Sequence, residues 1–218
     1  MVIKIAITIY ALNILDKRLY TNGISQNIII LFDFLNNIDN IDAYLKSDNI
    51  TNIKKYKCFK NMDKLAEMDI VIEIGLVLTE EEKNFCKKHT IKLIKWRWGN
   101  DYIYDTEALL QKTGSGSINC AKGFDEHWIS PHFAYSIDYY KYISGNNNVE
   151  IAPYFWKPNL LTPLTKKFDH TNINIGVFEP NSNYGKNCFI PIIICEKVKT
   201  QINKAYIVNG RKIENKFF

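Results

Sequence analysis

The segment DIVIEIG, residues 69–75, is the stretch that decides the fold class. Its isoleucines and its valine occupy both faces of an extended chain, which is typical of a strand buried on both sides in a parallel sheet. Parallel strands need long crossover connections, usually helices, and these helices cover the two faces of the sheet. The segment therefore predicts an α/β protein.

Strand and helix patterns alternate on either side of this segment. Residues 2–10 form a predicted strand, and apolar side chains recur at helical spacing over residues 24–35. Thr79 and Glu82 form a capping box at the start of another helix. We therefore predict a doubly wound, mostly parallel, Rossmann-like sheet. Its other elements are strands at 41–45, 91–98, 126–129 and 149–154, a short helix at 62–68, and a helix between Ser130 and Gly145.

The end of the chain carries a second strand–helix–strand pattern after a proline-punctuated stretch. Such a unit cannot cover both faces of its own sheet, so it either completes the first sheet or opens a second domain. We expect the second arrangement, with this chain as the amino-terminal part of a two-domain protein. The pattern occupies residues 172–179, 186–200 and 204–208. The predicted divisions are a first domain at 1–155, a linker at 156–171 and an incomplete second Rossmann-like domain at 172–218.

The composition of the chain argues against a nucleic-acid-binding, disulfide-rich or zinc-binding protein. The chain has 218 residues, of which 46% are hydrophobic and 23% charged, as in a globular protein. The net charge is +5, but the lysines form scattered pairs and no nucleic-acid-binding face. Five cysteines without CxxC spacing indicate neither a disulfide framework nor a zinc site.

The first residues favour a strand over a signal peptide, which is the alternative, because they lack a small-residue cleavage site. No apolar run approaches the roughly 20 residues that span a bilayer. We therefore expect a cytoplasmic protein without a transmembrane segment, and peripheral contact with a membrane is compatible with this composition.

Polar residues at the start of the first helix form the first candidate site, because ligands bind beyond the carboxyl ends of strands in doubly wound sheets. Gly23, Gln26 and Asn27 lie in the segment GISQN. Free backbone amides at a helix start favour an anion or a hydroxyl-rich ligand, and the alternative is simple capping. No GxGxxG fingerprint is present, so a dinucleotide cofactor is not predicted.

The segment WRWGNDY, residues 96–102, is the second candidate. Indole rings can stack on sugars, and Arg97, Asn100 and Tyr102 are predicted to contact substrate. The alternative is that the two tryptophans belong to the core. Asp101 is our predicted general base, because a carboxylate within hydrogen-bond reach of a substrate hydroxyl can take up its proton.

Two further candidates lie later in the chain. Glu126, in the segment DEHW, is predicted to contact substrate, and His132 is the reserve base. The loop after residues 172–179 contains the segment FEPN and ends in Lys186 at a predicted helix start, an arrangement suited to a diphosphate. The Walker pattern GxxxxGK[ST] is absent.

These four motifs, in this order, resemble an uncharacterised family of bacterial glycosyltransferase-like proteins of the GT-B type, which have two Rossmann-like domains. The resemblance implies an acceptor-side domain first and a nucleotide-sugar domain second. It places Glu179, Asn181 and Lys186 at the donor diphosphate. Most of the second domain of such proteins has no counterpart in this chain.

We therefore predict a glycosyltransferase that moves a sugar from a nucleotide donor to a glycan or lipid-linked acceptor. Neither a metal ion nor a cofactor is predicted, because a helix dipole and basic side chains can neutralise a leaving diphosphate. The alternative is a non-catalytic α/β binding or interaction module. A nucleic-acid binder is the third choice, since no motif for one is present.

Overall fold

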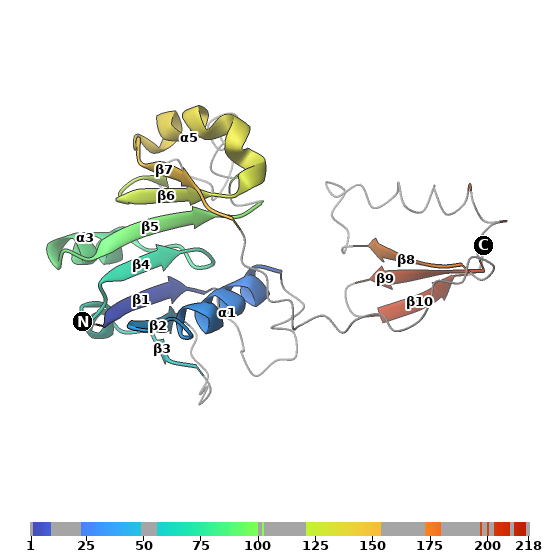
Figure 1. The fold of residues 1–218 in the computed structure, drawn as a ribbon, viewed down its shortest axis with the longest axis horizontal. Helices are drawn as coiled ribbons and strands as arrows, with labels where there is room; N and C mark the ends of the chain where they lie inside the picture. The colour runs from blue at the N-terminus through green and yellow to red at the C-terminus, as the bar shows by residue number, and fades with distance from the viewer. Residues whose placement is uncertain are drawn as a thin grey trace. The chain divides into compact units, whose positions relative to one another are not determined.

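The computed structural model describes residues 2–9, 23–48, 56–99, 102, 121–153, 173–179, 197, 200, 203–209 and 212–216. The chain divides into two compact units, Met1–Pro158 and Asn159–Phe218 (Figure 1). Each unit contains a β-sheet of its own.

The first unit is built on a seven-stranded sheet in which every neighbouring pair of strands is parallel. The strand order is β3-β2-β1-β4-β5-β6-β7, so the chain starts in the middle and builds outwards in both directions. This confirms the predicted α/β fold with a parallel, Rossmann-like sheet. The strands are β1 (Ile3–Thr8), β2 (Ile41–Lys46), β3 (Cys58–Phe59), β4 (Ile70–Glu73), β5 (Lys92–Arg97), β6 (Glu126–Ile129) and β7 (Val149–Ile151).

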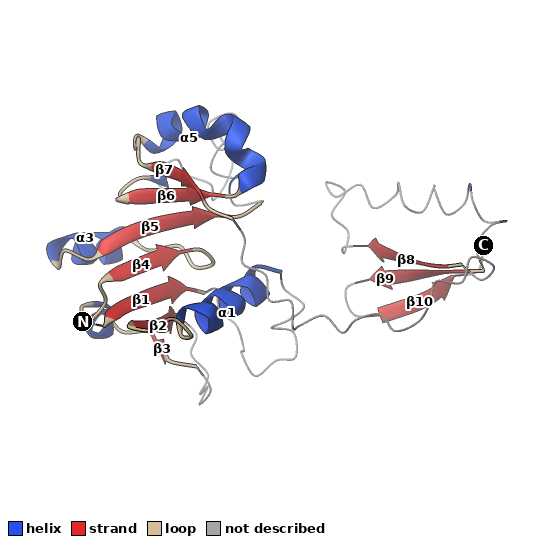
Figure 2. Cartoon of the chain, in the orientation of Figure 1, coloured by secondary structure: helices blue, strands red, loops and turns tan. Residues whose placement is uncertain are grey.

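Helices cover both faces of this sheet and alternate with the strands along the chain (Figure 2). Helix α1 (Gly23–Leu35) buries Ile28, Leu31 and their neighbours in one hydrophobic cluster, together with Ile7 and Ile72 of the sheet. Helices α2 (Met62–Leu65) and α3 (Glu80–Lys88) pack in a second cluster on the opposite face. The two clusters explain why the central strands are apolar on both sides.

Strand β4 shows this double burial most clearly. Val71 belongs to the second cluster and Ile72 to the first, although they are adjacent in the sequence. Successive side chains of a strand point to opposite faces, so the segment at residues 69–75 contributes to both layers. The prediction that this strand is buried on both faces is confirmed.

The predicted capping box at the start of α3 is also confirmed. The Thr79 hydroxyl accepts from the Glu82 amide at 3.2 Å, and the Glu82 carboxylate accepts from the Thr79 amide at 2.8 Å. The last helix of the unit differs from its prediction. A 3-10 helix (Pro131–Ser136) precedes α5 (Ile137–Ser144), and the Ser130 side chain makes no capping bond. Gly145 ends α5 with φ of 66°, as predicted for a glycine cap.

Replacing Thr79 with alanine is expected to lower the free energy of unfolding by about 1 kcal/mol, because an N-cap hydroxyl satisfies an otherwise free helix amide. Urea denaturation of the variant and of wild type measures the difference. Ser130→Ala is the matched control, because the buried Ser130 hydroxyl has no hydrogen-bond partner among the described residues. A decrease in unfolding free energy in Ser130→Ala equal to that in Thr79→Ala would contradict the assignment of Thr79 as the N-cap of α3.

The second unit contains β8 (Asn174–Glu179), β9 (Lys204–Asn209) and β10 (Lys212–Lys216) in the order β10-β9-β8. Strands β8 and β9 are parallel, and β10 runs antiparallel to β9. The strands predicted at 172–179 and 204–208 therefore pair with each other in a separate sheet. The predicted helix at 186–200 lies largely outside the described residues.

Candidate functional site

The strand order of the first sheet reverses between β1 and β4, which places the topological switch point at the carboxyl ends of these two strands. In open α/β sheets, ligands bind outside the carboxyl ends of the strands at such a point. Thr8, the last residue of β1, joins the two strands there. Its hydroxyl accepts from the amides of Ile74 at 3.0 Å and Leu76 at 3.3 Å.

Polar side chains form a row across the sheet close to this edge. The strand registers place Lys46 beside Thr8, Glu73 beside Lys95, and Lys95 beside His127. Ile7 pairs with Ile72, so Thr8 also lies beside Glu73. We call these five residues the polar row. All five are at most 1% exposed, although a buried polar group is costly unless it is paired.

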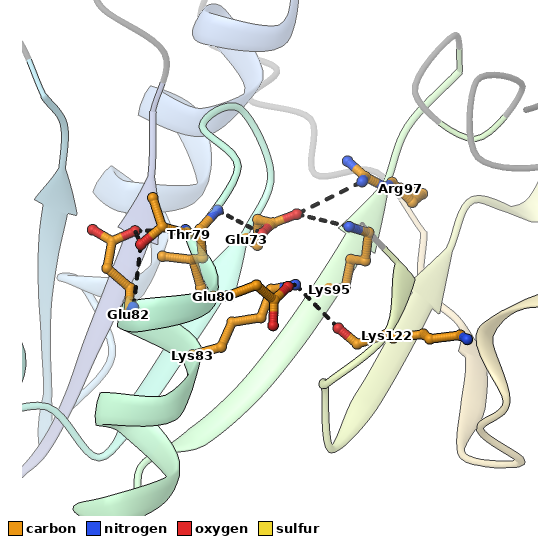
Figure 3. Close-up of polar contacts among 9 residues, drawn as sticks. Glu73, Thr79, Glu80, Glu82, Lys83, Lys95, Arg97 and Lys122 are labelled. Carbon is orange, nitrogen blue, oxygen red and sulfur yellow. Dashed lines mark hydrogen bonds and ion pairs between the residues drawn. The ribbon is translucent and has the colours of Figure 1, made fainter. Parts of the chain in front are cut away.

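Glu73 is the centre of the charges in this region (Figure 3). Its Oε1 accepts from Lys95 Nζ at 2.9 Å and lies 3.6 Å from Arg97 Nη2. Its Oε2 accepts from the Leu78 amide at 2.8 Å. We call Glu73, Lys95 and Arg97 the Glu73 cluster. One carboxylate therefore holds two cations at the carboxyl ends of β4 and β5.

One further lysine, Lys83, is buried beside this cluster. Lys83 of α3 donates to the Glu80 carboxylate at 2.8 Å and to the Lys122 carbonyl at 3.1 Å (Figure 3). The ammonium groups of Lys83 and Lys95 lie 5.1 Å and 4.7 Å from the centre of the Phe124 ring. An aromatic face attracts cations, so Phe124 stabilises both lysines in a region shielded from water.

Lys46, at the end of the polar row in β2, has its own counter-ion. Its ammonium lies 2.6 Å from Oε1 of Glu82, the same residue whose Oε2 completes the capping box of α3. The ion pair therefore ties the first turn of α3 to the sheet.

His127 is an uncharged, titratable member of the polar row. Burial, together with the charges of Lys95 and Arg97, lowers the pKa of its imidazole to about 3. The ring packs edge-on against Phe124 and Tyr140, and neither ring nitrogen has a hydrogen-bond partner among the described residues. The imidazole is therefore uncharged at neutral pH.

One residue of the segment GISQN packs against the hydrophobic cluster that contains the tryptophans at and just after the end of β5. Gly23 is the first residue of α1, while Gln26 and Asn27 are half-buried in its first turns. Ile24 packs against the cluster that contains Trp96 and Trp98. The first turn of α1 has no acidic side chain to offset the positive end of the helix dipole.

The tryptophans themselves belong to the core, as the alternative interpretation predicted. Trp96 is fully buried and Trp98 is 5% exposed. Their rings meet edge to face with centroids 5.0 Å apart, and Trp96 makes the same kind of contact with Trp128 at 5.2 Å. Such edge-to-face contacts stabilise the core beyond the area buried.

Tyr102 belongs to the hydrophobic cluster that contains Ile129 and Tyr140. Its ring stacks on Phe133 and Tyr140, and its hydroxyl makes a hydrogen bond with the Ser136 hydroxyl. Burial raises the pKa of the Tyr102 hydroxyl, although the bond to Ser136 partly offsets this. The structure thus ties Tyr102 to the helical segment that follows β6.

Glu126 and His132 lie in different surroundings. Glu126 is the first residue of β6, and its carboxylate lies 2.6 Å from Lys92 Nζ, near the amino ends of the strands. It also accepts from the Trp128 indole at 2.6 Å. His132 is exposed in the 3-10 helix, where its ring packs against Phe133.

The remaining predicted site residues are not placed relative to this edge. Glu179 is the last residue of β8. Asn100, Asp101, Asn181 and Lys186 lie outside the described residues. In the described part of the chain, no group of three or more His, Cys, Asp or Glu side chains is arranged to hold a metal ion. No described helix is long and apolar enough to cross a membrane.

The sequence interpretation named Arg97 but missed Glu73, Lys95 and the buried environment of His127. A signal was present in the strand segments, because a glutamate interrupts DIVIEIG and a lysine interrupts the strand at 91–98. A charged residue in a strand buried on both faces requires a partner. Two buried charged residues of opposite sign on neighbouring strands therefore predict an ion pair.

Comparison with known proteins gives a family match. A family model described as "Protein of unknown function (DUF2827)" matches residues 5–216. No curated protein matches the chain. Among solved structures, an AraC family transcriptional regulator from Pseudomonas putida is 12% identical, with a TM-score of 0.31. That match covers 70% of this chain and 76% of the regulator, and so low a TM-score supports no conclusion about function.

Proposed function

The chain belongs to the DUF2827 family, matched over residues 5–216, and from that premise we propose that it is a glycosyltransferase that takes its sugar from a nucleotide donor. The observation that carries the proposal is the switch point between β1 and β4, with the polar row beside it. The four motifs that resemble GT-B proteins give the reaction class. We propose a glycan or lipid-linked acceptor and action in the cytoplasm.

The proposed reaction is a displacement at the anomeric carbon of the donor sugar. The acceptor hydroxyl oxygen forms a bond to that carbon, while the bond from the carbon to the phosphate oxygen breaks. The nucleoside diphosphate leaves with the electron pair, and the hydroxyl proton passes to a base, for which Asp101 is the first choice and His132 the second. The proposal assigns Glu179, Asn181 and Lys186 to the leaving diphosphate, and it needs neither a metal ion nor a cofactor.

The second candidate is a non-catalytic α/β binding module. It is favoured by the burial of two predicted substrate contacts, since Arg97 and Tyr102 are 5% and 4% exposed and both bond to other residues of the chain. Both candidates use the same edge of the sheet. They differ in whether the protein transfers the sugar of the bound donor to an acceptor.

Nucleotide sugars are expected to raise the thermal unfolding midpoint of the protein. A ligand at 100 times its Kd adds about 2.7 kcal/mol of stability, which corresponds to a shift of roughly 5–10 °C for a chain of this size. Scanning calorimetry with UDP, GDP and their sugars measures the shift, and release of nucleoside diphosphate measures turnover. A shift without release on any glycan acceptor would favour the binding module. No shift with any nucleotide would contradict the proposal.

A further inference from the structure

We infer that the exposed face of the helical segment at residues 131–144 binds an uncharged oligosaccharide through Tyr135, Tyr139 and Tyr142. We call these three residues the tyrosine stripe. The inference rests on the proposed function in taking this oligosaccharide as the acceptor. It adds the surface that holds the acceptor and the chemical class of the chain that is bound there.

The tyrosine stripe is a row of aromatic side chains on the solvent side of the segment between β6 and β7. Its members follow one another at intervals of four and three residues, which places them on the same face of a helix. Tyr135 is 86% exposed, Tyr139 40% and Tyr142 80%. Single exposed apolar residues need no explanation, but a row of large ones on one face marks an interaction site.

The opposite face of the same segment holds the stripe in place. Tyr140 and Ile143 of α5 are buried in the hydrophobic cluster that also contains Ile129 of β6 and Val149 of β7. The backbone that carries the stripe is therefore fixed against the sheet before a ligand binds. A tyrosine side chain has only two χ angles, so ordering it on binding costs little conformational entropy.

The position of the stripe connects it with the edge of the sheet where ligands bind. The helical segment starts two residues after the carboxyl end of β6 and leads back to the start of β7, which is parallel to β6. The stripe therefore runs along the helix axis away from the carboxyl edge. His132, the second-choice base, lies one turn before Tyr135. A chain-like acceptor can thus present one end at the carboxyl edge while its other sugars lie on the tyrosines.

The chemistry of this face favours sugars. The apolar face of a sugar ring can stack on an aromatic ring, and tyrosine hydroxyls can exchange hydrogen bonds with sugar hydroxyls. One turn of an α-helix rises about 5.4 Å, which is similar to the length of one sugar in an extended chain. Successive tyrosines can therefore stack on successive sugars.

The charges of the segment favour an uncharged ligand over an anionic one. Asp138 and Lys141 are the oppositely charged residues of α5, and their Oδ1 and Nζ atoms lie 3.8 Å apart. The helix therefore presents no net charge. Helices that bind membrane surfaces instead carry several lysines or arginines on the polar face, so an anionic membrane is the less favoured partner.

A glycan array probed with the full chain, followed by titration calorimetry with the uncharged oligosaccharide that binds best, tests the inference. Wild type is expected to bind at least one such oligosaccharide. Tyr135→Ala and Tyr142→Ala are each expected to weaken binding roughly three- to tenfold, because each removes one stacking contact. Tyr142→Phe keeps the ring and is expected to bind more tightly than Tyr142→Ala. The thermal unfolding midpoints of these variants should equal that of wild type, since both side chains are exposed.

Ile38→Ala is the matched control, because Ile38 is an exposed apolar residue outside the stripe, just after α1. Its affinity for the oligosaccharide is expected to equal that of wild type. The inference is overturned if no uncharged oligosaccharide binds, or if Tyr135→Ala and Tyr142→Ala bind it as well as wild type does. In the second case, loss of self-association in sedimentation would assign the stripe to a second copy of the chain. Loss of binding to vesicles of phosphatidylcholine and phosphatidylglycerol would assign it to a membrane.

Nucleotide sugars separate a failure of this inference from a failure of the proposed function. A thermal shift with nucleotide sugars in a protein that binds no oligosaccharide removes this inference and leaves the proposed function. Oligosaccharide binding that depends on the stripe, without any response to nucleotide sugars, retains the stripe as a sugar-binding surface and removes the transferase. Where both ligands bind, Tyr142→Ala is expected to raise the KM for the acceptor and to leave the KM for the donor unchanged.

Discussion

Replacing Glu73 with glutamine is expected to lower the free energy of unfolding by about 3–5 kcal/mol, because it removes the carboxylate charge that lies 2.9 Å from the buried Lys95 ammonium. Glu73 and Lys95 are both 0% exposed, so water cannot replace the missing charge. The amide oxygen of glutamine can still accept from the Leu78 amide, which confines the loss to the ionic contacts. Urea denaturation at pH 7, compared with wild type, measures the difference.

The double variant Glu73→Gln with Lys95→Met separates the effect of charge on stability from the effect of packing. A buried ion pair that is replaced as a whole often costs little, because the desolvation of both charges is removed together. The double variant is therefore expected to regain most of the stability that Glu73→Gln loses. An unfolding free energy for the double variant below that of Glu73→Gln would contradict the view that the loss comes from the ion pair between Glu73 and Lys95.

A loss of 3–5 kcal/mol is a large share of the 5–15 kcal/mol by which most domains are stable. The pair lies at the carboxyl edge of the sheet, which is the edge at which open α/β sheets bind their ligands.

The sequence predicted the first unit well because its elements follow local rules. The apolar runs of β1, β4 and β5, the helical spacing in α1 and the capping box of α3 are each fixed by neighbouring residues. The two strands that were missed lack such signals. Strand β3 has only two residues, and β10 is KIENK, in which lysine, glutamate and asparagine have low strand propensity. These strands depend on pairing with a neighbour.

The candidate site was harder to predict, because it depends on register between strands far apart in the sequence. Glu73 meets Lys95 only because β4 and β5 are neighbours with Glu73 opposite Lys95. A shift of one residue would send the Lys95 side chain to the α1 face. By contrast, Tyr102 and Glu126 were chosen for their residue type within motifs. The structure places Tyr102 against Phe133 and Ser136, and Glu126 beside Lys92.

The second large effect is expected on acidification, because His127 of the folded protein takes up a proton only near pH 3. Its pKa is about 3 in the folded protein and 6.5 when unperturbed, so below pH 6.5 the unfolded state binds a proton that the folded state does not. Stability is then lost as the pH falls, and the loss stops below about pH 3, where both states are protonated. Between pH 7 and pH 5 the expected loss from this one residue is about 2 kcal/mol.

The variant His127→Phe isolates this contribution from that of other titrating groups. Phenylalanine preserves the edge-on contacts with Phe124 and Tyr140 and cannot take up a proton. The difference in unfolding free energy between pH 7 and pH 5 is therefore expected to be about 2 kcal/mol smaller in the variant than in wild type. Equal pH dependence in the two proteins, or an imidazole NMR signal of His127 that titrates between pH 5 and pH 8, would show that the ring is charged beside Lys95.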